Sequence, residues 1–132
     1  MKQSLVQIAL VVDDYDKAIQ YYTKKLQFTL IEDTPLSETK RWVVVRPNGG
    51  NGASLLLAKA ANENQKRSIG NQTGGRVFLF LHTDDFDRDY ENLLRQEIKI
   101  INGPREEEYG KVVVFEDLYG NLWDLIQPYK TN

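Results

Sequence analysis

Residues 11–26, VVDDYDKAIQYYTKKL, and residues 82–97, HTDDFDRDYENLLRQE, repeat the same order of features. Each stretch starts at the end of an apolar strand pattern, continues with two aspartates, and then carries apolar residues at helical spacing. The aspartates stand where a helix N-cap needs a carboxylate to accept hydrogen bonds from the first free amide groups. The repeat therefore predicts two copies of a strand–helix unit, with the aspartates as caps and not as metal ligands.

Three strand-like segments follow each predicted helix: FTLIED, RWVVVR and ASLLLAK in the first half, then IKIING, KVVVFED and NLWDLIQ in the second. Turn signals separate them, notably at 47–52 and 117–120. The order predicts an α+β fold of two β-α-β-β-β modules, at about 1–58 and 75–128. The polar segment 59–74 is predicted to link the modules, with room for a short helix.

Composition limits the classes of protein that this chain can represent. Its 132 residues, 41% of them hydrophobic, predict one compact domain over the whole chain. Seventeen basic and nineteen acidic residues give a net charge of −2 without any long block of one sign, so nucleic acid is not an expected partner. The chain contains no cysteine, and its N-terminus has neither a cleavable signal nor a membrane span, so we expect a cytoplasmic protein that does not bind membranes.

Two longer stretches carry a family resemblance. VQIALVVDDYDKAIQYYTKKLQF (6–28) and FEDLYGNLWDLIQP (115–128) resemble the opening and closing segments of the vicinal oxygen chelate superfamily, also called glyoxalase/bleomycin resistance/dioxygenase proteins. The resemblance covers almost the whole chain. It implies the glyoxalase/bleomycin resistance fold, in which two modules form a cup-shaped curved sheet, with the site inside the cup and a homodimer as the common assembly.

In metal-using members of that family, each module supplies ligands from its first and last strands. The first of these positions falls on Gln7, where the family has His or Gln, and the last falls on Asp124, where it usually has Glu. Leu56 occupies the position of a Glu at the end of the first module. In the second module, equal spacing from the helix cap gives Phe78, and a two-residue extension gives Arg76. Leucine, phenylalanine and arginine side chains do not bind metal cations. The sequence therefore predicts no metal ligand at Leu56 in the first module or at Phe78 or Arg76 in the second.

Counting ligands also excludes one activity. An iron dioxygenase site needs two histidines, and the chain has only His82. Gln7 and Asp124 alone supply too few ligands for a zinc or nickel isomerase. We therefore expect no cofactor. Weak metal binding at these two residues, or a ligand from a partner chain, is the alternative.

Asp124 is the one acid in an otherwise apolar strand pattern. Alternation places it on the same strand face as Leu122 and Ile126, toward the implied cup. A carboxylate flanked by apolar residues such as Phe78 and Leu56 would have its ionised form destabilised unless Arg76 or Gln7 interacted with it. Such an acid would be a candidate general base. The structural alternative is an acid on an edge strand that faces water, or a simple hydrogen-bond acceptor.

The remaining candidate residues are predicted to contact a ligand. His82 would be the last cup-facing residue of the series that contains Arg76 and Phe78, although a solvated or capping histidine is the commoner outcome. Trp42 shares a strand face with Arg46, an arrangement that suits a planar or anionic ligand, although a surface-packed tryptophan is more frequent. The predicted catalytic residues are Asp124 and Gln7, and the predicted substrate-binding residues are Arg76, Phe78, His82, Trp42 and Leu56. The stretch REEEYG (105–110) is predicted to be a solvated loop.

Three functions remain open. The first is a metal-independent lyase or isomerase that acts on a small oxygenated metabolite, with Asp124 as base. The second is sequestration of a small toxic compound without chemistry, as the resemblance to bleomycin resistance proteins implies. The third is metal-dependent activity of the lactoylglutathione lyase type, which the ligand count disfavours.

Overall fold

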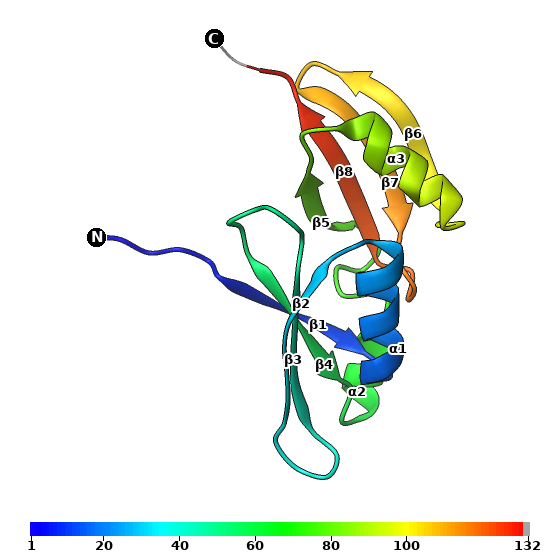
Figure 1. Cartoon of the computed structure of the whole chain (residues 1–132). Coiled ribbons are helices and arrows are strands. Elements are labelled where there is room, and N and C mark those ends of the chain that lie inside the picture. Colours follow the sequence, from blue (N-terminus) through cyan, green and yellow to red (C-terminus); the bar gives the residue numbers. More distant parts are fainter. Residues whose placement is uncertain (131–132) are drawn as a thin grey trace. The chain divides into compact units, whose positions relative to one another are not determined.

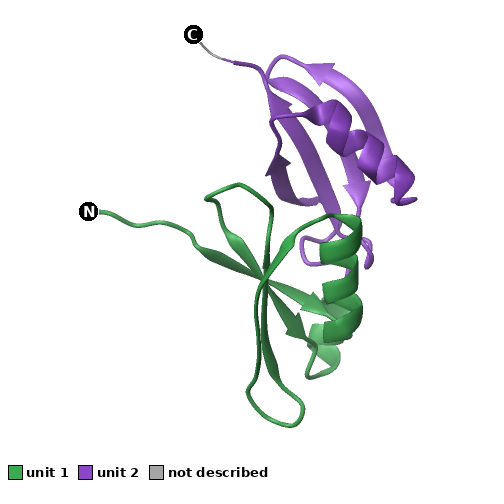
Figure 2. Ribbon diagram, viewed as in Figure 1, with its two compact units in different colours: residues 1–69 green, residues 70–132 purple. Residues whose placement is uncertain are grey.

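The computed structural model describes residues 1–130, which fold as two compact units (Figure 2). Unit 1 comprises Met1–Ile69, and unit 2 begins at Gly70. The boundary falls inside the linker predicted at 59–74, and this segment contains the short helix α2 (Glu63–Ser68).

Unit 1 is a four-stranded sheet with a helix packed on one face (Figure 1). The strand order is β1-β4-β3-β2, in which β1 and β4 are parallel and the other neighbours are antiparallel. Before α2, its elements are β1 (Gln7–Val12), α1 (Tyr15–Gln20), the π-helical turn η1 (Tyr21–Lys25), β2 (Thr29–Pro35), β3 (Arg41–Arg46) and β4 (Ser54–Lys59).

Unit 2 repeats this topology with the strand order β5-β8-β7-β6. Here β5 and β8 are the parallel pair. Its elements are β5 (Val77–His82), α3 (Phe86–Arg95), β6 (Ile100–Glu107), β7 (Gly110–Glu116) and β8 (Leu122–Pro128). The predicted α+β fold of two β-α-β-β-β modules is therefore confirmed. None of the helices in residues 1–130 combines the length and apolar character needed to cross a membrane.

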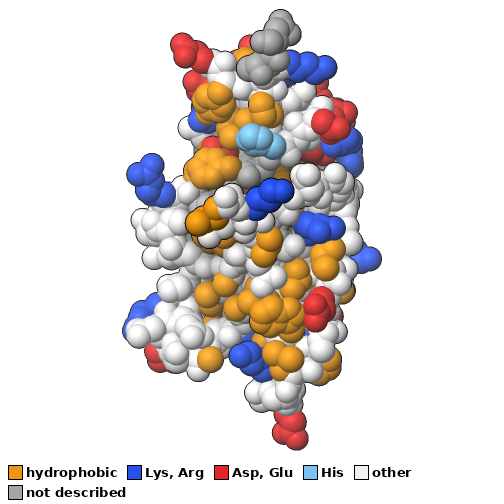
Figure 3. Space-filling model, turned by 90° about the vertical axis from the view of Figure 1, so that its left-hand side faces the viewer, with side chains coloured by type: hydrophobic (Ala, Val, Ile, Leu, Met, Phe, Trp, Pro, Cys, Tyr) orange, Lys and Arg blue, Asp and Glu red, His pale blue; other side chains and the backbone are white. Residues whose placement is uncertain are grey.

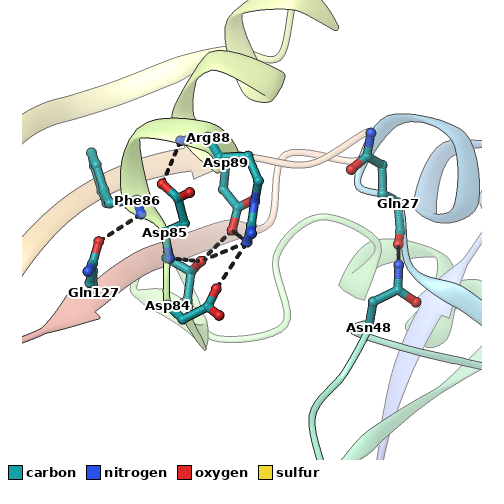
Figure 4. Close-up of polar contacts among 9 residues, drawn as sticks. Gln27, Asn48, Asp84, Asp85, Phe86, Arg88, Asp89 and Gln127 are labelled. Carbon is teal, nitrogen blue, oxygen red and sulfur yellow. Dashed lines mark hydrogen bonds and ion pairs between the residues drawn. The ribbon is translucent and has the colours of Figure 1, made fainter.

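The aspartate pairs cap the helices, as predicted. The Asp14 carboxylate accepts a hydrogen bond from the Lys17 backbone N–H at 2.8 Å, and Asp85 accepts one from the Arg88 N–H at 3.1 Å. In unit 2, Asp84 also pairs with the Arg88 guanidinium at 3.2 Å (Figure 4). Each N-cap contributes on the order of 1 kcal/mol to helix stability, so the repeated aspartates are explained by structure alone.

The two helices end in the same way but differ in length by one residue. Gln27 and Glu97 follow them in the left-handed conformation, at φ of 61° and 57°. One residue more lies between Asp14 and Gln27 than between Asp85 and Glu97. Unit 1 accommodates this extra residue in the π-helical turn at Tyr21–Lys25. The polypeptide therefore leaves the helix at an equivalent point in each unit.

Each unit has its core between its sheet and its helix. Alternate residues of β1, β3 and β4 in unit 1, and of β7 and β8 in unit 2, form these cores and are almost completely buried. In unit 1 these residues are Leu10, Val12, Val43, Val45, Leu55 and Leu57, and in unit 2 they are Val113, Phe115, Trp123 and Leu125. The remaining residues of the same strands lie on the opposite sheet faces, where the candidate site residues are found.

The turn before β8 is organised by a buried carboxylate, Asp117. Its two oxygens accept hydrogen bonds from the backbone N–H groups of Tyr119 and Asn121, from the Asn121 amide, and from the Trp123 indole at 3.1 Å. Gly120 completes the turn at φ +94°. These bonds fix the entry of β8, and hence the register of Asp124 within the sheet.

Gly70 meets this turn at close range. Its φ is +74°, and a Cβ placed on it would lie 1.9 Å from the carbonyl oxygen of Tyr119. Only glycine allows such an approach of two backbone segments. The end of the linker is therefore packed against the turn that precedes β8.

Candidate functional site

Three predicted residues of unit 1 lie on one face of its sheet, opposite α1. Gln7 is paired with Ser54, and Leu56 with Val44. Trp42 alternates with Val44 along β3 and is half-buried on the same face. The structure therefore brings Gln7, Leu56 and Trp42 to a common surface.

Arg41, the neighbour of Trp42, points to the other face. Its guanidinium binds the Asp33 carboxylate at 2.7 Å and the Asp16 carboxylate of α1 at 2.9 Å, and it lies 5.2 Å from the centre of the Tyr15 ring. The hydrogen bond from Arg41 lowers the pKa of Asp33. Arg41 thus ties α1 to the sheet, and the predicted alternation of Arg41 and Trp42 is confirmed.

A β-bulge in β5 interrupts the predicted series of Arg76, Phe78, Phe80 and His82. Val77 pairs with Leu122, whereas Leu79 pairs with the very next residue of β8. By register, the counterpart of Gln7 in unit 2 is therefore Val77, not Phe78 or Arg76. Arg76 itself is exposed and lies before the strand. The simple alternation predicted from sequence is wrong here, because the bulge adds one residue to β5.

Asp124 lies in the middle of the unit 2 sheet. Strand β8 runs between β5 and β7, with Asp124 opposite Phe80 on one side and Val114 on the other. The edge-strand interpretation of this acid is therefore wrong. Its side chain is on the sheet face opposite α3, together with Leu122 and Ile126, and we call this surface the Asp124 face.

One oxygen of the Asp124 carboxylate is buried without a hydrogen bond within residues 1–130. The residue is 8% exposed, and its Oδ1 atom has no hydrogen bond within residues 1–130. Burial raises the pKa of Asp124, and the charge of Arg105 acts in the opposite direction. The cation whose charge acts on Asp124 is thus Arg105 of β6, and not Arg76, the cation that the sequence suggested.

Arg105 is held in place on β6, the edge strand. Its Nε donates to Glu107 Oε1 at 2.7 Å, and its Nη1 donates to Asn102 Oδ1 at 3.1 Å. Register places Asn102 opposite Val114, in the row of Asp124. The bond to Asn102 therefore draws the guanidinium toward Asp124, and Glu107 fixes its other side and raises the pKa of Arg105.

These β6 residues were missed by sequence reasoning. REEEYG was predicted to be a loop, yet residues 105–107 are strand and only 108–109 form the turn. Register shifts on both sides of Asn102 put Asn102 and Arg105 on the same face although they are three positions apart. Gly103 and Pro104 between them resemble a turn in sequence, and no other signal indicated that the strand continues.

Phe80 and His82 complete the Asp124 face on the other edge strand, β5. Phe80 is 64% exposed, and His82 is exposed and opposite Ile126. The imidazole in Figure 3 has hydrophobic side chains beside it. An exposed phenyl ring next to a buried carboxylate offers a ligand apolar contact and a hydrogen-bond acceptor together.

The residues at the family's metal-ligand positions do not fit a divalent ion. Leu56 and Val77 carry no donor atom, and the group that acts on Asp124 is a cation, Arg105. Within residues 1–130, no three His, Cys, Asp or Glu side chains are grouped so that they could hold a metal. The donor set is suited to hydrogen bonding and not to metal coordination.

Comparisons with known proteins agree with this fold. A profile of the Glyoxalase/Bleomycin resistance protein/Dioxygenase superfamily matches residues 4–125. An uncharacterized protein of Shewanella frigidimarina (strain NCIMB 400) is 63% identical over 128 residues, which cover 96% of this chain and 95% of that protein.

Two solved structures are similar over nearly the whole chain. TnmS3, an antibiotic binding protein from Streptomyces sp. CB03234, is 27% identical with a TM-score of 0.75, covering 97% of this chain and 98% of that one. UcmS2 is 26% identical with a TM-score of 0.81, covering 96% and 98%. The chain belongs to the Glyoxalase/Bleomycin resistance protein/Dioxygenase superfamily.

Proposed function

We propose that this protein binds a small oxygenated organic molecule on the Asp124 face, with the Asp124 carboxylate as hydrogen-bond acceptor for the ligand. One observation carries the proposal: Oδ1 of Asp124 is buried and has no hydrogen bond within residues 1–130. A buried polar atom without a partner costs roughly 1–3 kcal/mol, and native structures satisfy nearly all such atoms. A ligand hydroxyl or N–H group would remove that cost.

The surroundings of Asp124 support an apolar or aromatic ligand frame. The exposed Phe80 ring is its direct neighbour on β5, and Ile126 and Val114 are apolar neighbours on the same face. The similar protein TnmS3 is an antibiotic binding protein. Sequestration of a compound of this kind requires only affinity, which the arrangement on the Asp124 face can supply.

Catalysis is the second candidate function, and the electrostatics of Asp124 favour it. Burial raises the pKa of this carboxyl group, which makes its ionised form a stronger base, while Arg105 favours ionisation. A base of this kind can remove a proton from carbon or oxygen of a bound ligand, as a lyase or isomerase requires. We derive no metal-dependent step, because the donor set does not fit a metal.

A thermal-shift screen of small oxygenated compounds tests both functions. The wild type is compared with Asp124→Asn and with Glu106→Gln, which changes an exposed acid on the other face of β6. A ligand of Asp124 should stabilise the wild type and the Glu106→Gln protein but bind the Asp124→Asn protein about tenfold more weakly or worse.

Each hit is then assayed for consumption by mass spectrometry. Binding without consumption identifies sequestration. Consumption that falls by roughly 10²–10⁴ in Asp124→Asn identifies Asp124 as a base. Hits that bind and react equally well in Asp124→Asn would show that the carboxylate plays no part.

The assembly and location of the protein are further parts of this proposal. We expect the protein to be cytoplasmic. We also expect a homodimer, because the edge strands β2 and β6 carry exposed apolar residues such as Ile31 and Ile101. Light scattering measures the mass directly. A species of 15.3 kDa at micromolar concentration would contradict the homodimer.

A further inference from the structure

We propose that Arg105 is the second ligand-contacting residue of the Asp124 face, and that the site selects a neutral group with an N–H or O–H donor beside an acceptor oxygen. This inference rests on the proposed binding function and specifies its ligand class. The donor of the ligand would bind Oδ1 of Asp124, and its acceptor oxygen would bind the free edge of the Arg105 guanidinium.

The geometry of β6 supplies that free edge. Glu107 engages Nε of Arg105 at 2.7 Å, and Asn102 engages Nη1 at 3.1 Å. Within residues 1–130, Nη2 makes no hydrogen bond, and the Arg105 side chain is 36% exposed. A guanidinium fixed on one side presents its remaining N–H groups in a defined direction, which lowers the entropic cost of binding an oxygen there.

Sheet register brings this donor and the Asp124 acceptor to one surface. Asn102 on β6 and Asp124 on β8 are both paired with Val114, which lies between them on β7. Arg105 is paired with Val112, two residues away along β7. Because Asn102 holds the Arg105 side chain toward its own row, the guanidinium lies on the Asp124 side of its strand position. One unpaired acceptor and one unpaired donor thus share the Asp124 face.

The charges on this face decide the ligand class. Arg105 is already neutralised by Glu107, and Asp124 adds a further negative charge. A carboxylate or other anion would face both acids and would be repelled. Other titratable groups of unit 2 near this arrangement are His82 on β5, Glu116 on β7, which pairs with Lys99, and Tyr109, which acts electrostatically on Arg105. A neutral carboxamide-like or hydroxy-carbonyl group on an apolar frame complements the arrangement.

Three probes of nearly equal shape test the assignment: benzamide, acetophenone and benzoate. All carry the phenyl ring that Phe80 would contact, but only benzamide is neutral with both a donor and an acceptor. Binding is measured at millimolar concentrations from chemical shift changes in ¹H–¹⁵N spectra, which also show that each variant remains folded. We expect benzamide to bind about tenfold more tightly than either other probe, the effect of one hydrogen bond to a charged group.

Variants assign the contacts. Arg105→Gln should weaken benzamide binding about tenfold, and Arg105→Lys, which keeps the charge without the fork of donors, should lose less. Glu107→Gln removes one acid and releases the guanidinium, so it should increase benzoate binding relative to the wild type. The side chain of Glu106 is on the opposite face, so Glu106→Gln should change neither benzamide binding nor benzoate binding.

Several results would overturn the inference. Equal affinities for the three probes, or no benzamide binding, would refute the donor–acceptor selection. Benzamide binding that depends on Asp124 but not on Arg105 would refute the role of Arg105 while leaving the proposed function intact. Binding that survives both Asp124→Asn and Arg105→Gln unchanged would refute the two proposals together.

Discussion

Replacing Asp124 with asparagine should make the protein more stable at neutral pH. The side chain is 8% exposed and its Oδ1 has no hydrogen bond within residues 1–130, so the ionised form is held at a cost of roughly 1–3 kcal/mol. Attraction to Arg105 offsets less than about 1 kcal/mol of this, because that guanidinium is 36% exposed and already bound to Glu107. The net gain for Asp124→Asn is therefore about 1 kcal/mol, or roughly 3–6 °C in Tm for a domain of this size.

The stability gained by Asp124→Asn should increase as the pH rises. Burial raises the pKa of Asp124 in the folded protein above its value in the unfolded chain, so folding favours the protonated acid. The stability that this protonation supplies is complete below the unfolded pKa, about 3.9, and is lost as pH rises through the higher folded pKa. Asparagine does not titrate. The Tm difference should be small below about pH 4 and should reach its full size near neutral pH.

Calorimetry across this pH range measures the effect, with Glu106→Gln as the control that changes the same net charge at an exposed position. Both variants should unfold in a transition of the same shape as the wild type, so that midpoints can be compared. A Tm of Asp124→Asn below that of the wild type at pH 8 would refute the reasoning. It would mean that the ionised carboxylate stabilises the fold through a partner.

Two other substitutions test the turn before β8. Asp117→Asn should lower the free energy of unfolding by about 2–4 kcal/mol, because the amide cannot accept all the hydrogen bonds that the carboxylate receives, including the one from Trp123. Urea denaturation measures this change, and a loss below about 1 kcal/mol would contradict the expectation. Gly70→Ala should cost at least about 1–2 kcal/mol for its left-handed backbone, and more for the clash with Tyr119, measured in the same way; Asn71→Ala is the control, and equal midpoints would show that the linker is not packed there.

The main features of the fold could be predicted because they depend on local patterns. The repeated aspartates, the helical spacing and the alternation of Arg41 and Trp42 each follow from a short stretch of chain. The π-helical turn at Tyr21–Lys25 was not predictable, because one extra residue changes the apolar spacing too little to be recognised. Local patterns identified the elements but not their irregularities.

The candidate site depended on those irregularities, and its prediction was correspondingly incomplete. Asp124 was found because an acid is conspicuous among apolar strand residues. Arg105 was not, because Gly103 and Pro104 before it are typical of a turn, although an edge strand tolerates proline at a bulge. The bulge in β5 likewise moved Val77 into the position predicted for Phe78. Pairing across a sheet is a long-range property, and a bulge changes which residues it brings together.

The closing segment FEDLYGNLWDLI contains two buried acids, Asp117 and Asp124, which differ in their hydrogen bonds. Asp117 receives bonds from two backbone N–H groups, an amide and an indole, and it thereby holds the turn. Asp124 is buried to a similar extent, and its Oδ1 receives no hydrogen bond within residues 1–130. Burial is therefore the same for both acids, whereas the hydrogen bonds differ, and this difference is the reason for proposing a ligand at Asp124 and not at Asp117. Stability changes of opposite sign on replacement of each acid by asparagine would express that difference directly.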